Sequence, residues 1–283
     1  MNKILITGGN GQLGLALKDV LAKEEILLTD TDNMDITEPS QIERIFADFK
    51  PTHLIHGAAM TNVDGCEENP ELAQKVNADG TKKLAEACKK HKCRMIYVST
   101  DYVFDGKKQE SYTEKDKTNP QSVYGKTKLD GEKHTLELPN SYVVRTSWVY
   151  GEGKNFVRTM LALSEKMEEV RVVNDQFGRP TYAPDLARAI YDIIQKNPMT
   201  GIYNVTGDGS VISWADFARE IFKIASKKTK VVGISTEEYL SQYPDKKIAL
   251  RPEYSSLDLE KIKKITSLEN WPSSLDKYVS KEK

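Results

Sequence analysis

A tyrosine and a lysine four positions apart can do acid–base chemistry when a helix presents both on one face. The chain holds 13 tyrosines among its 283 residues. Three of them precede a lysine at this spacing, in the pairs Tyr124/Lys128, Tyr150/Lys154 and Tyr243/Lys247. Glycines interrupt the second pair and a proline follows the tyrosine of the third, which disfavours a regular helix at both places. The first pair is therefore the candidate, and its alternative is an ordinary exposed amphipathic helix.

The chemistry favours the first pair further because a strand ending in Ser99-Thr100 precedes it. A tyrosine with a pKa near 10 must give a proton to an alkoxide at neutral pH, and an adjacent ammonium group lowers that pKa. A threonine hydroxyl can hold the same oxygen in place. We therefore predict Thr100, Tyr124 and Lys128 as a catalytic group for carbonyl chemistry.

A second pattern, Thr7-Gly8-Gly9-Asn10-Gly11-Gln12-Leu13-Gly14, stands between a predicted strand and a predicted helix. Glycines at such a turn let the backbone approach a pyrophosphate, whose charge lies at the helix N-terminus. An acidic residue about 20 positions further on usually binds the ribose hydroxyls, and Asp30 has that place. The pattern predicts dinucleotide binding. The alternatives are a purely structural turn and a turn aspartate.

Composition excludes several other classes of protein. Hydrophobic residues make up 39% and charged residues 29% of the chain, as in ordinary globular proteins. The net charge of −1 gives no field that would attract nucleic acid or an anionic membrane. Met1-Asn2-Lys3 precedes too few apolar residues for a signal sequence, so we expect a cytoplasmic protein that does not enter the membrane.

The histidines and cysteines show no metal-ligand spacing, so we predict no metal site. The four histidines are interpreted as structural or surface residues, and the three cysteines as reduced thiols. These residues are His53, His56, His91 and His134, and Cys66, Cys88 and Cys93.

The candidate catalytic and cofactor residues must be positioned by helices and strands, and the first half of the chain predicts a regular arrangement of them. Short β-rich runs alternate with helix-length amphipathic stretches, which is typical of a parallel sheet with helices on both faces. The predicted strands are Lys3–Thr7, Ile26–Thr29, His53–His56, Arg94–Val98 and Tyr142–Thr146. The predicted helices are Gly11–Lys23, Pro39–Phe49, Pro70–His91, Ser122–Leu138, Asn155–Lys166, Pro184–Gln195 and Ser213–Ser226. Asn69 is predicted to cap the third helix, and Ser213 with Asp216 forms a sequence typical of a capping box.

The fold class is therefore α/β, a Rossmann-like doubly wound parallel sheet with a smaller discontinuous α/β lobe. We expect the dinucleotide-binding domain to comprise residues 1–148 and about 176–206. The remaining segments, about 149–175 and 207–283, form the expected second lobe.

Together these motifs resemble the extended short-chain dehydrogenase/reductase superfamily. Within it, four longer blocks look like the dTDP-4-dehydrorhamnose reductase family, and a fifth, Ala249-Leu250-Arg251-Pro252, extends the similarity towards the C-terminus. The four blocks are Thr7 to Gly14, Ser99-Thr100-Asp101-Tyr102-Val103-Phe104-Asp105-Gly106, Arg145-Thr146-Ser147-Trp148-Val149-Tyr150-Gly151 and Asp175-Gln176-Phe177-Gly178-Arg179-Pro180-Thr181. The resemblance implies reduction of the C4 keto group of dTDP-4-dehydro-L-rhamnose by NAD(P)H, the last step of dTDP-L-rhamnose synthesis.

The resemblance also implies further site residues. The cofactor would contact Tyr124, Lys128, the glycine loop, the residues that follow the second and third strands, and Asn77 on the next helix. These other positions are Gly8, Asn10, Gly11, Gln12, Leu13, Gly14, Asp30, Asp35, Ile36, Ala58, Ala59 and Asn77. The sugar nucleotide would contact Thr100, Tyr102, Trp148, Asn155 and Arg251. Aromatic rings suit a deoxyhexose or thymine ring, and a fixed cation suits a diphosphate. Trp148 could equally be a core residue.

The sequence departs from the family at one point. Some members bind Mg²⁺ and dimerise through glutamates, one of them in the first turn of the helix after the glycine loop. Here that helix opens Leu15-Ala16-Leu17, which makes a Mg²⁺ role doubtful and leaves a monomer or a dimer without a metal bridge. NADPH is the expected cofactor and NADH stays possible, because Asp30 would repel a 2′-phosphate if it points at the ribose.

Three alternatives stay open. A 4,6-dehydratase would need an acid and a base beside the threonine, typically Asp-Glu, where this chain has Asp101-Tyr102. An epimerase uses the same catalytic trio. The regulatory subunit of methionine adenosyltransferase resembles these reductases but serves as a binding partner, and an intact trio argues against it.

Overall fold

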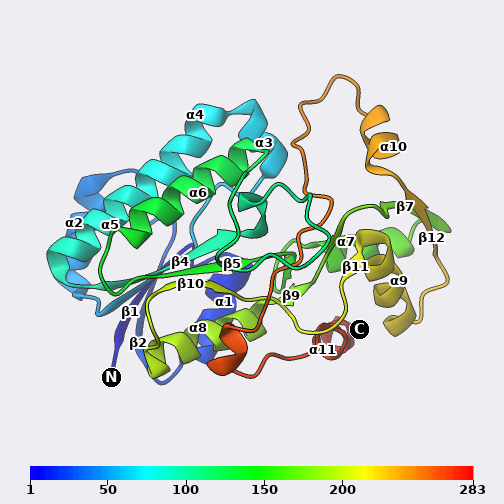
Figure 1. Cartoon of the computed structure of the whole chain (residues 1–283). Helices are drawn as coiled ribbons and strands as arrows, with labels where there is room; N and C mark the ends of the chain where they lie inside the picture. Colours follow the sequence, from blue (N-terminus) through cyan, green and yellow to red (C-terminus); the bar gives the residue numbers. More distant parts are fainter. Residues whose placement is uncertain (283) are drawn as a thin grey trace.

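A parallel six-stranded sheet forms the centre of the computed structural model, which describes residues 1–282 (Figure 1). The strand order is β10-β5-β4-β3-β1-β2, which confirms the predicted doubly wound sheet. The strands are β1 (Lys3–Thr7), β2 (Glu25–Thr29), β3 (His53–His56), β4 (Arg94–Thr100), β5 (Tyr142–Thr146) and β10 (Gly201–Asn204). Because all of them are parallel, their carboxyl ends meet at one edge, where ligands bind in such folds.

The observed strands differ from the predicted ones at two informative places. β4 continues to Thr100, two residues beyond the predicted range Arg94–Val98, so that Ser99 and Thr100 end a central strand as the catalytic pattern requires. The edge strand β10 was not predicted. It is four residues long and is stabilised by pairing with β5, a contact that a local pattern does not reveal.

Helices cover both faces of the sheet (Figure 1). On one face, α1 (Gln12–Val20) and α8 (Ala183–Lys196) pack together over a core that contains Ile4, Ile6 and Val144. On the other face lie α2 (Pro39–Phe49), α5 (Thr81–His91) and α6 (Val123–Leu136). Leu5, Leu54 and Met95 face the core on that side. The four central strands are therefore buried on both faces, as expected of a parallel sheet, whereas the edge strand β2 is largely half-buried.

The predicted helix Pro70–His91 is continuous but not uniform. It consists of α4 (Pro70–Ala73), a π-helical segment Gln74–Gly80 and α5. The predicted side-chain cap is wrong: Asn69 has the N-cap position, but its amide Nδ2 donates 3.5 Å back to the Gly65 carbonyl. Asn69 also ends the preceding helix α3 (Val63–Glu68), which the sequence analysis did not predict.

A second hydrophobic core lies in the C-terminal half, where aromatic side chains such as Tyr150, Phe217 and Trp271 pack together. It is built by α7 (Phe156–Ser164), α9 (Trp214–Ile224), α11 (Trp271–Lys281) and the parallel pair β7 (Glu169–Val173) and β12 (Lys230–Ile234). Ser213 and Asp216 form the predicted capping box of α9. Smaller elements complete the lobe and the loops: β6 (Val149–Tyr150), β8 (Phe177–Gly178), β9 (Thr181–Tyr182), β11 (Ile212–Ser213), α10 (Thr236–Ser241) and the 3₁₀ turns Asp101–Val103 and Ile262–Lys264.

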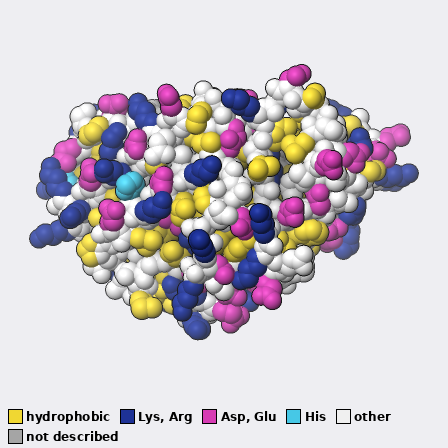
Figure 2. All heavy atoms as spheres, turned by 45° about the horizontal axis from the view of Figure 1, so that its top comes forward, with side chains coloured by type: hydrophobic (Ala, Val, Ile, Leu, Met, Phe, Trp, Pro, Cys, Tyr) yellow, Lys and Arg dark blue, Asp and Glu magenta, His cyan; other side chains and the backbone are white. Residues whose placement is uncertain are grey.

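Within residues 1–282, no helix has the length and apolar character needed to cross a membrane. Figure 2 shows basic and acidic side chains interspersed over the face it presents. That face therefore carries no large patch of one sign, in keeping with the balanced composition.

Candidate active site

Two adjoining cavities open at the carboxyl ends of the strands. The larger, of about 620 Å³, extends from the glycine loop past Thr100 and Tyr124 to Trp148. The smaller, of about 260 Å³, lies beside the end of β2. Both are lined by the same residues at their junction, namely Thr7, Gly8, Gly11, Gly57, Ala59 and Thr61. The cavities together provide an elongated cleft across the carboxyl edge of the sheet.

The glycine loop between β1 and α1 has the features that a bound pyrophosphate requires. Gly8 has φ +72°, and a Cβ atom at Gly14 would overlap the carbonyl oxygens of Gly8 and Gly9. The α1 N-terminus has neither a side-chain cap nor an acidic residue in its first turn, so its N–H groups remain available for an anion. Gln12 lines the cavity, and its Oε1 is buried there without a hydrogen-bond partner within residues 1–282. These residues fit a dinucleotide.

The second cavity holds the acidic residue at the end of β2. Asp30 Oδ2 accepts a hydrogen bond of 3.0 Å from the Asn10 backbone N–H, so this carboxylate also fixes the glycine loop. Asp35, Ile36 and Ala58 line the same cavity. Leu13 lines the larger one. Of the predicted cofactor residues, all but Asn77 line one of the two cavities.

Asn77 does not line the cleft, contrary to the expectation. It lies in the π-helical segment, fully buried, where its Oδ1 accepts from the Met60 N–H at 2.7 Å. Its Nδ2 donates to the Met60 carbonyl and, at 3.1 Å, to Thr127 Oγ1 of α6. Asn77 therefore supports the loop of the cleft from beneath and ties it to α6.

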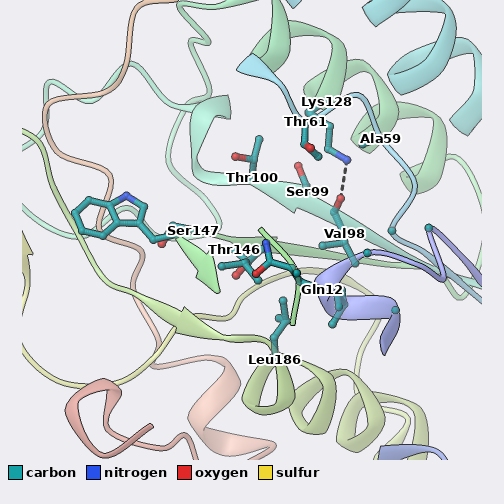
Figure 3. Close-up of a pocket in the computed structure, with 18 of the residues that line it drawn as sticks. Gln12, Ala59, Thr61, Val98, Ser99, Thr100, Lys128, Thr146, Ser147 and Leu186 are labelled. Carbon is teal, nitrogen blue, oxygen red and sulfur yellow. Dashed lines mark hydrogen bonds between the residues drawn. The ribbon is translucent and has the colours of Figure 1, made fainter. Parts of the chain in front are cut away.

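The predicted catalytic residues lie together in the larger cavity. Thr100 ends β4 and lies near Lys128 of α6 (Figure 3). Tyr124 lies one turn before Lys128 on the same helix. The 3₁₀ turn after Thr100 approaches α6 so closely that a Cβ atom at Gly125 would overlap the Tyr102 carbonyl oxygen. The rings of Tyr102 and Tyr124 meet edge to face with centroids 5.5 Å apart.

Lys128 is buried, and its surroundings explain its protonation. Its Nζ donates a hydrogen bond of 2.7 Å to the Val98 carbonyl, the dashed line of Figure 3, and lies 4.2 Å from the centre of the Tyr97 ring. Burial lowers the pKa of Lys128 to about 7, against an opposing contribution from Glu132. The lysine is therefore poised between its charged and neutral forms near neutral pH.

The expected lowering of the Tyr124 pKa is not observed. Burial raises the pKa of Tyr124, the Asp101 carboxylate raises it further, and a hydrogen bond with Thr100 acts in the opposite direction. The physical reason is that burial of the phenol disfavours its charged form more than the hydrogen bond with Thr100 favours it. Tyr124 is thus fully protonated at neutral pH and able to donate a proton.

Asp101 is a site residue that the sequence did not predict to be part of the catalytic group. Burial raises the pKa of this carboxyl to about 6, although hydrogen bonds from Ser255 and Thr100 lower it. Thr100 Oγ1 donates to Asp101 Oδ1 at 2.9 Å, whereas Oδ2 is buried without a partner among the described residues. Its position directly after Thr100, where a 4,6-dehydratase would have its acid, is the sequence signal that pointed to it.

Three of the residues expected to contact the sugar nucleotide line the larger cavity, namely Thr100, Tyr102 and Trp148. Tyr102 lies beside Tyr124, and Trp148 follows β5 in a left-handed backbone conformation with φ +48°. The Trp148 indole stacks on Trp214 with ring centroids 3.7 Å apart. Trp214, at the start of α9, also lines the cavity and was not predicted. The second core therefore contributes an aromatic wall to the site.

Asn155 does not line the cavity. Its Oδ1 caps α7 by accepting from the Arg158 N–H at 3.0 Å. Its Nδ2 donates to the Gly151 carbonyl at 2.6 Å and to Tyr278 at 2.9 Å. These contacts hold the loop between β6 and α7, which is a structural role.

Arg251 does not line either cavity. Its guanidinium pairs with Asp64 of α3 at 3.0 Å, and the same aspartate accepts the Ala249 N–H at 3.0 Å. Burial opposes the charge of Arg251, but the hydrogen bond with Asp64 outweighs it and raises the arginine pKa.

Among residues 1–282, no cluster of three or more His, Cys, Asp or Glu side chains is arranged to hold a metal ion. His56 is buried between Thr7 Oγ1 at 2.7 Å and Thr81 Oγ1 at 3.0 Å, and burial lowers its pKa well below the usual value. This neutral histidine supports the loop that follows β3.

Comparison with known proteins assigns the chain to a family. A sequence model of the RmlD substrate binding domain matches residues 1–283. The dTDP-4-dehydrorhamnose reductase of Aggregatibacter actinomycetemcomitans is 40% identical over 97% of each chain. The chain belongs to the dTDP-4-dehydrorhamnose reductase family.

Solved structures of the family agree with this assignment. The dTDP-4-dehydrorhamnose reductase of Clostridium acetobutylicum has a TM-score of 0.92 at 42% identity and covers 99% of each chain. That of Bacillus anthracis, in complex with NADP, has a TM-score of 0.92 at 36% identity and covers 100% of each chain. The similarity to the dTDP-4-dehydrorhamnose reductases thus includes both cores and the whole cleft.

Proposed function

We propose that this protein is an NAD(P)H-dependent oxidoreductase that reduces the C4 keto group of dTDP-4-dehydro-L-rhamnose to give dTDP-L-rhamnose. The observation that carries the proposal is the meeting of Thr100, Tyr124 and Lys128 in one cavity that continues into the glycine loop. Membership of the reductase family supports the substrate.

NADPH is the proposed cofactor, and NADH remains the alternative. The Bacillus anthracis relative was solved with NADP, and here the uncapped α1 N-terminus and the glycine loop would receive the pyrophosphate. Asp30 would lie at the ribose of the adenosine, and Lys128 at the ribose of the nicotinamide. When bound, the reduced cofactor supplies the hydride for the carbonyl carbon.

The chain's own residues manage the proton and the orientation of the substrate. As the carbonyl carbon is reduced, its oxygen becomes an alkoxide, and the Tyr124 hydroxyl donates the proton that converts it to the alcohol. Thr100 would hydrogen bond the same oxygen. The Lys128 ammonium, while protonated, would stabilise the phenolate left on Tyr124. Solvent then returns a proton to Tyr124.

The wall of the larger cavity would recognise the sugar nucleotide. Tyr102, Trp148 and Trp214 offer aromatic surface for the deoxyhexose or the thymine. The charge of Arg251 would attract the diphosphate. Asn155 would position the loop between β6 and α7, which it holds by hydrogen bonds. We also propose the domain division 1–148 with about 176–206 for the cofactor, and 149–175 with 207–283 for the sugar nucleotide.

For the setting of the reaction, we propose a cytoplasmic enzyme that acts without nucleic acid or membrane. It would work as a monomer or as a dimer that no metal ion bridges.

The decisive experiment is turnover of dTDP-4-dehydro-L-rhamnose with NADPH and with NADH, with the product identified by mass and by NMR. A reductase consumes one reduced cofactor for each dTDP-L-rhamnose formed. An epimerase yields an isomer without net consumption of the cofactor, and a binding protein yields no product. Either of these outcomes would refute the proposal.

The matched variant is Tyr124→Phe, which keeps the ring but removes the acid. We expect its kcat to fall about 10²–10⁴-fold, because general acid catalysis contributes that much, with the affinity for the cofactor nearly unchanged. Turnover close to that of the wild type would remove Tyr124 from the mechanism.

A further inference from the structure

The first turn of α6, which carries Tyr124, is held from outside by α3. Glu67 Oε1 accepts a hydrogen bond of 2.7 Å from the backbone N–H of Val123, 56 residues further along the chain. Val123 is the first residue of α6 and the neighbour of Tyr124. Because the first N–H groups of a helix have no partner within the helix, an acceptor from another element decides where the helix begins.

A second hydrogen bond fixes the same turn from its other side. Ser122 Oγ accepts the N–H of Gly125 at 3.1 Å, so Tyr124 stands between two anchored backbone amides. The carboxylate of Glu67 also suits this position electrostatically, because the N-terminus of a helix carries partial positive charge. Figure 1 shows α3 beside this end of α6.

The short helix that carries Glu67 is itself well anchored. Asn62 Oδ1 caps it by accepting the Gly65 N–H at 3.0 Å. Cys66 is fully buried, with its Sγ directed at the Met60 carbonyl. Met60 is bound by Asn77, which also donates to Thr127 of α6. The platform under Tyr124 is therefore joined to α6 at two points, Val123 and Thr127.

We propose that Glu67 is a positioning residue for the acid Tyr124. Glu67 lines neither cavity and so has no contact with the cleft, but its hydrogen bond sets the place of the residue before the tyrosine. This inference rests on the proposed reductase function. It predicts a loss in the chemical step with little loss in binding, since small misplacements of a reacting group are costly.

The test compares Glu67→Ala, Glu67→Gln and the control Glu68→Ala. Glutamine keeps an acceptor oxygen in place, and Glu68 is the exposed neighbouring carboxylate on the same helix. We expect Glu67→Ala to lower kcat about tenfold or more, with KM and the cofactor Kd changed less than about threefold. Glu67→Gln and Glu68→Ala should stay within about threefold of the wild-type kcat.

A variant at the donor tests the same bond without touching Glu67. Proline is tolerated at the first position of a helix, and Ser122 is extended, as a residue before proline should be. Val123→Pro therefore removes the N–H while the helix can still form, and should lower kcat as Glu67→Ala does. The double variant should be no worse than Val123→Pro alone, because both changes remove one interaction.

Hydrogen–deuterium exchange of residues 122–128 provides a readout that does not depend on turnover. Exchange should be faster in Glu67→Ala than in the wild type and unchanged in Glu67→Gln and Glu68→Ala. Unchanged exchange in Glu67→Ala, a loss confined to KM, or equal damage by alanine and glutamine would overturn the proposal. Absence of turnover in the wild type would instead refute the reductase function, and the exchange data would still decide the role of Glu67.

Discussion

Three ionisable side chains share one buried site, and their protonation explains its chemistry. Burial disfavours every charge in a cavity, so the pKa of Lys128 falls to about 7 while that of Asp101 rises to about 6. The same burial keeps Tyr124 protonated. The site therefore presents a neutral acid beside an ammonium that is only partly populated at neutral pH, and small changes of pH should alter the rate.

The pKa of Lys128 predicts a pH profile. Because the ammonium form is the active one, kcat/KM should be highest below pH 7 and fall as pH rises through about 7. Lys128→Arg stays protonated to much higher pH, so this variant should lose the alkaline decline even if its absolute rate is low. Initial rates between pH 6 and pH 9 measure both profiles.

The control for this profile is Lys126→Met on the same helix. Lys126 is exposed, so its removal should leave the alkaline decline unchanged. A wild-type profile that is flat from pH 6 to pH 9 would show that Lys128 does not titrate in this range.

Asp30 predicts the choice of cofactor. If its carboxylate accepts the ribose hydroxyls, Asp30→Ala should raise the ratio of the NADH Kd to the NADPH Kd about tenfold, or about 1.4 kcal/mol, since the 2′-phosphate gains relief from repulsion. Both affinities should also fall slightly, because Asp30 accepts the Asn10 N–H. Titration of both cofactors measures the ratio.

Asp32→Ala is the matched control for Asp30, since Asp32 is an exposed carboxylate in the same turn. Equal losses for NADH and NADPH in Asp30→Ala would place Asp30 outside the ribose site.

At the scale of elements, sequence alone predicted those whose signal is local. β1, β3, β5 and α2 have the predicted bounds, because buried apolar runs and flanking Pro or Gly residues define them. The strands β7 and β12 were not predicted, because such short strands are stabilised by pairing with each other rather than by a local sequence pattern. The π-helical segment inside 70–91 was also missed, since no residue type marks it.

The same distinction explains which site residues were placed correctly in the cleft. The glycine loop and the Tyr124/Lys128 pair are local patterns on single elements. Asn155 and Arg251 instead meet partners that lie 123 and 187 residues away, Tyr278 and Asp64. A single sequence contains no signal for such contacts, so both residues were assigned to the cavity wall, which they do not line.

Gly125 provides a prediction about how two elements fit together. A Cβ atom there would overlap the Tyr102 carbonyl, and the backbone of the 3₁₀ turn cannot yield without moving Thr100. Gly125→Ala should therefore destabilise the fold by about 1–3 kcal/mol through overpacking and lower kcat at the same time. Thermal unfolding and kinetics measure the two effects.

Alanine at the next position, in Lys126→Ala, is the control, because this side chain is exposed. A Gly125→Ala protein with wild-type kcat would show that the close approach of the turn to α6 is not needed for catalysis.

At the scale of the whole molecule, residues from both hydrophobic cores line one cavity. The glycine loop belongs to the sheet, whereas Trp214 belongs to the second core, and both line the larger cavity. Trp148, in its left-handed conformation two residues after the end of β5, stacks on Trp214 and so joins the two parts. Cofactor and sugar nucleotide would thus be brought together by side chains from separately packed regions of the chain.

The last prediction concerns metal dependence and assembly. A metal-bridged interface would need carboxylates on both subunits, because Mg²⁺ prefers hard oxygen ligands and keeps several of its waters. The first turn of α1, where the family resemblance would put one such ligand, contains no acidic residue. We therefore expect full turnover in excess EDTA and the same sedimentation coefficient with and without Mg²⁺. The matched gain-of-site variant is Leu15→Glu, because Leu15 is exposed on this helix. If the partner ligands are present, the sedimentation coefficient of this variant alone should change when Mg²⁺ is added. Loss of wild-type activity on chelation, or a shift from monomer to dimer when Mg²⁺ is added, would show that carboxylates elsewhere on the surface hold the ion.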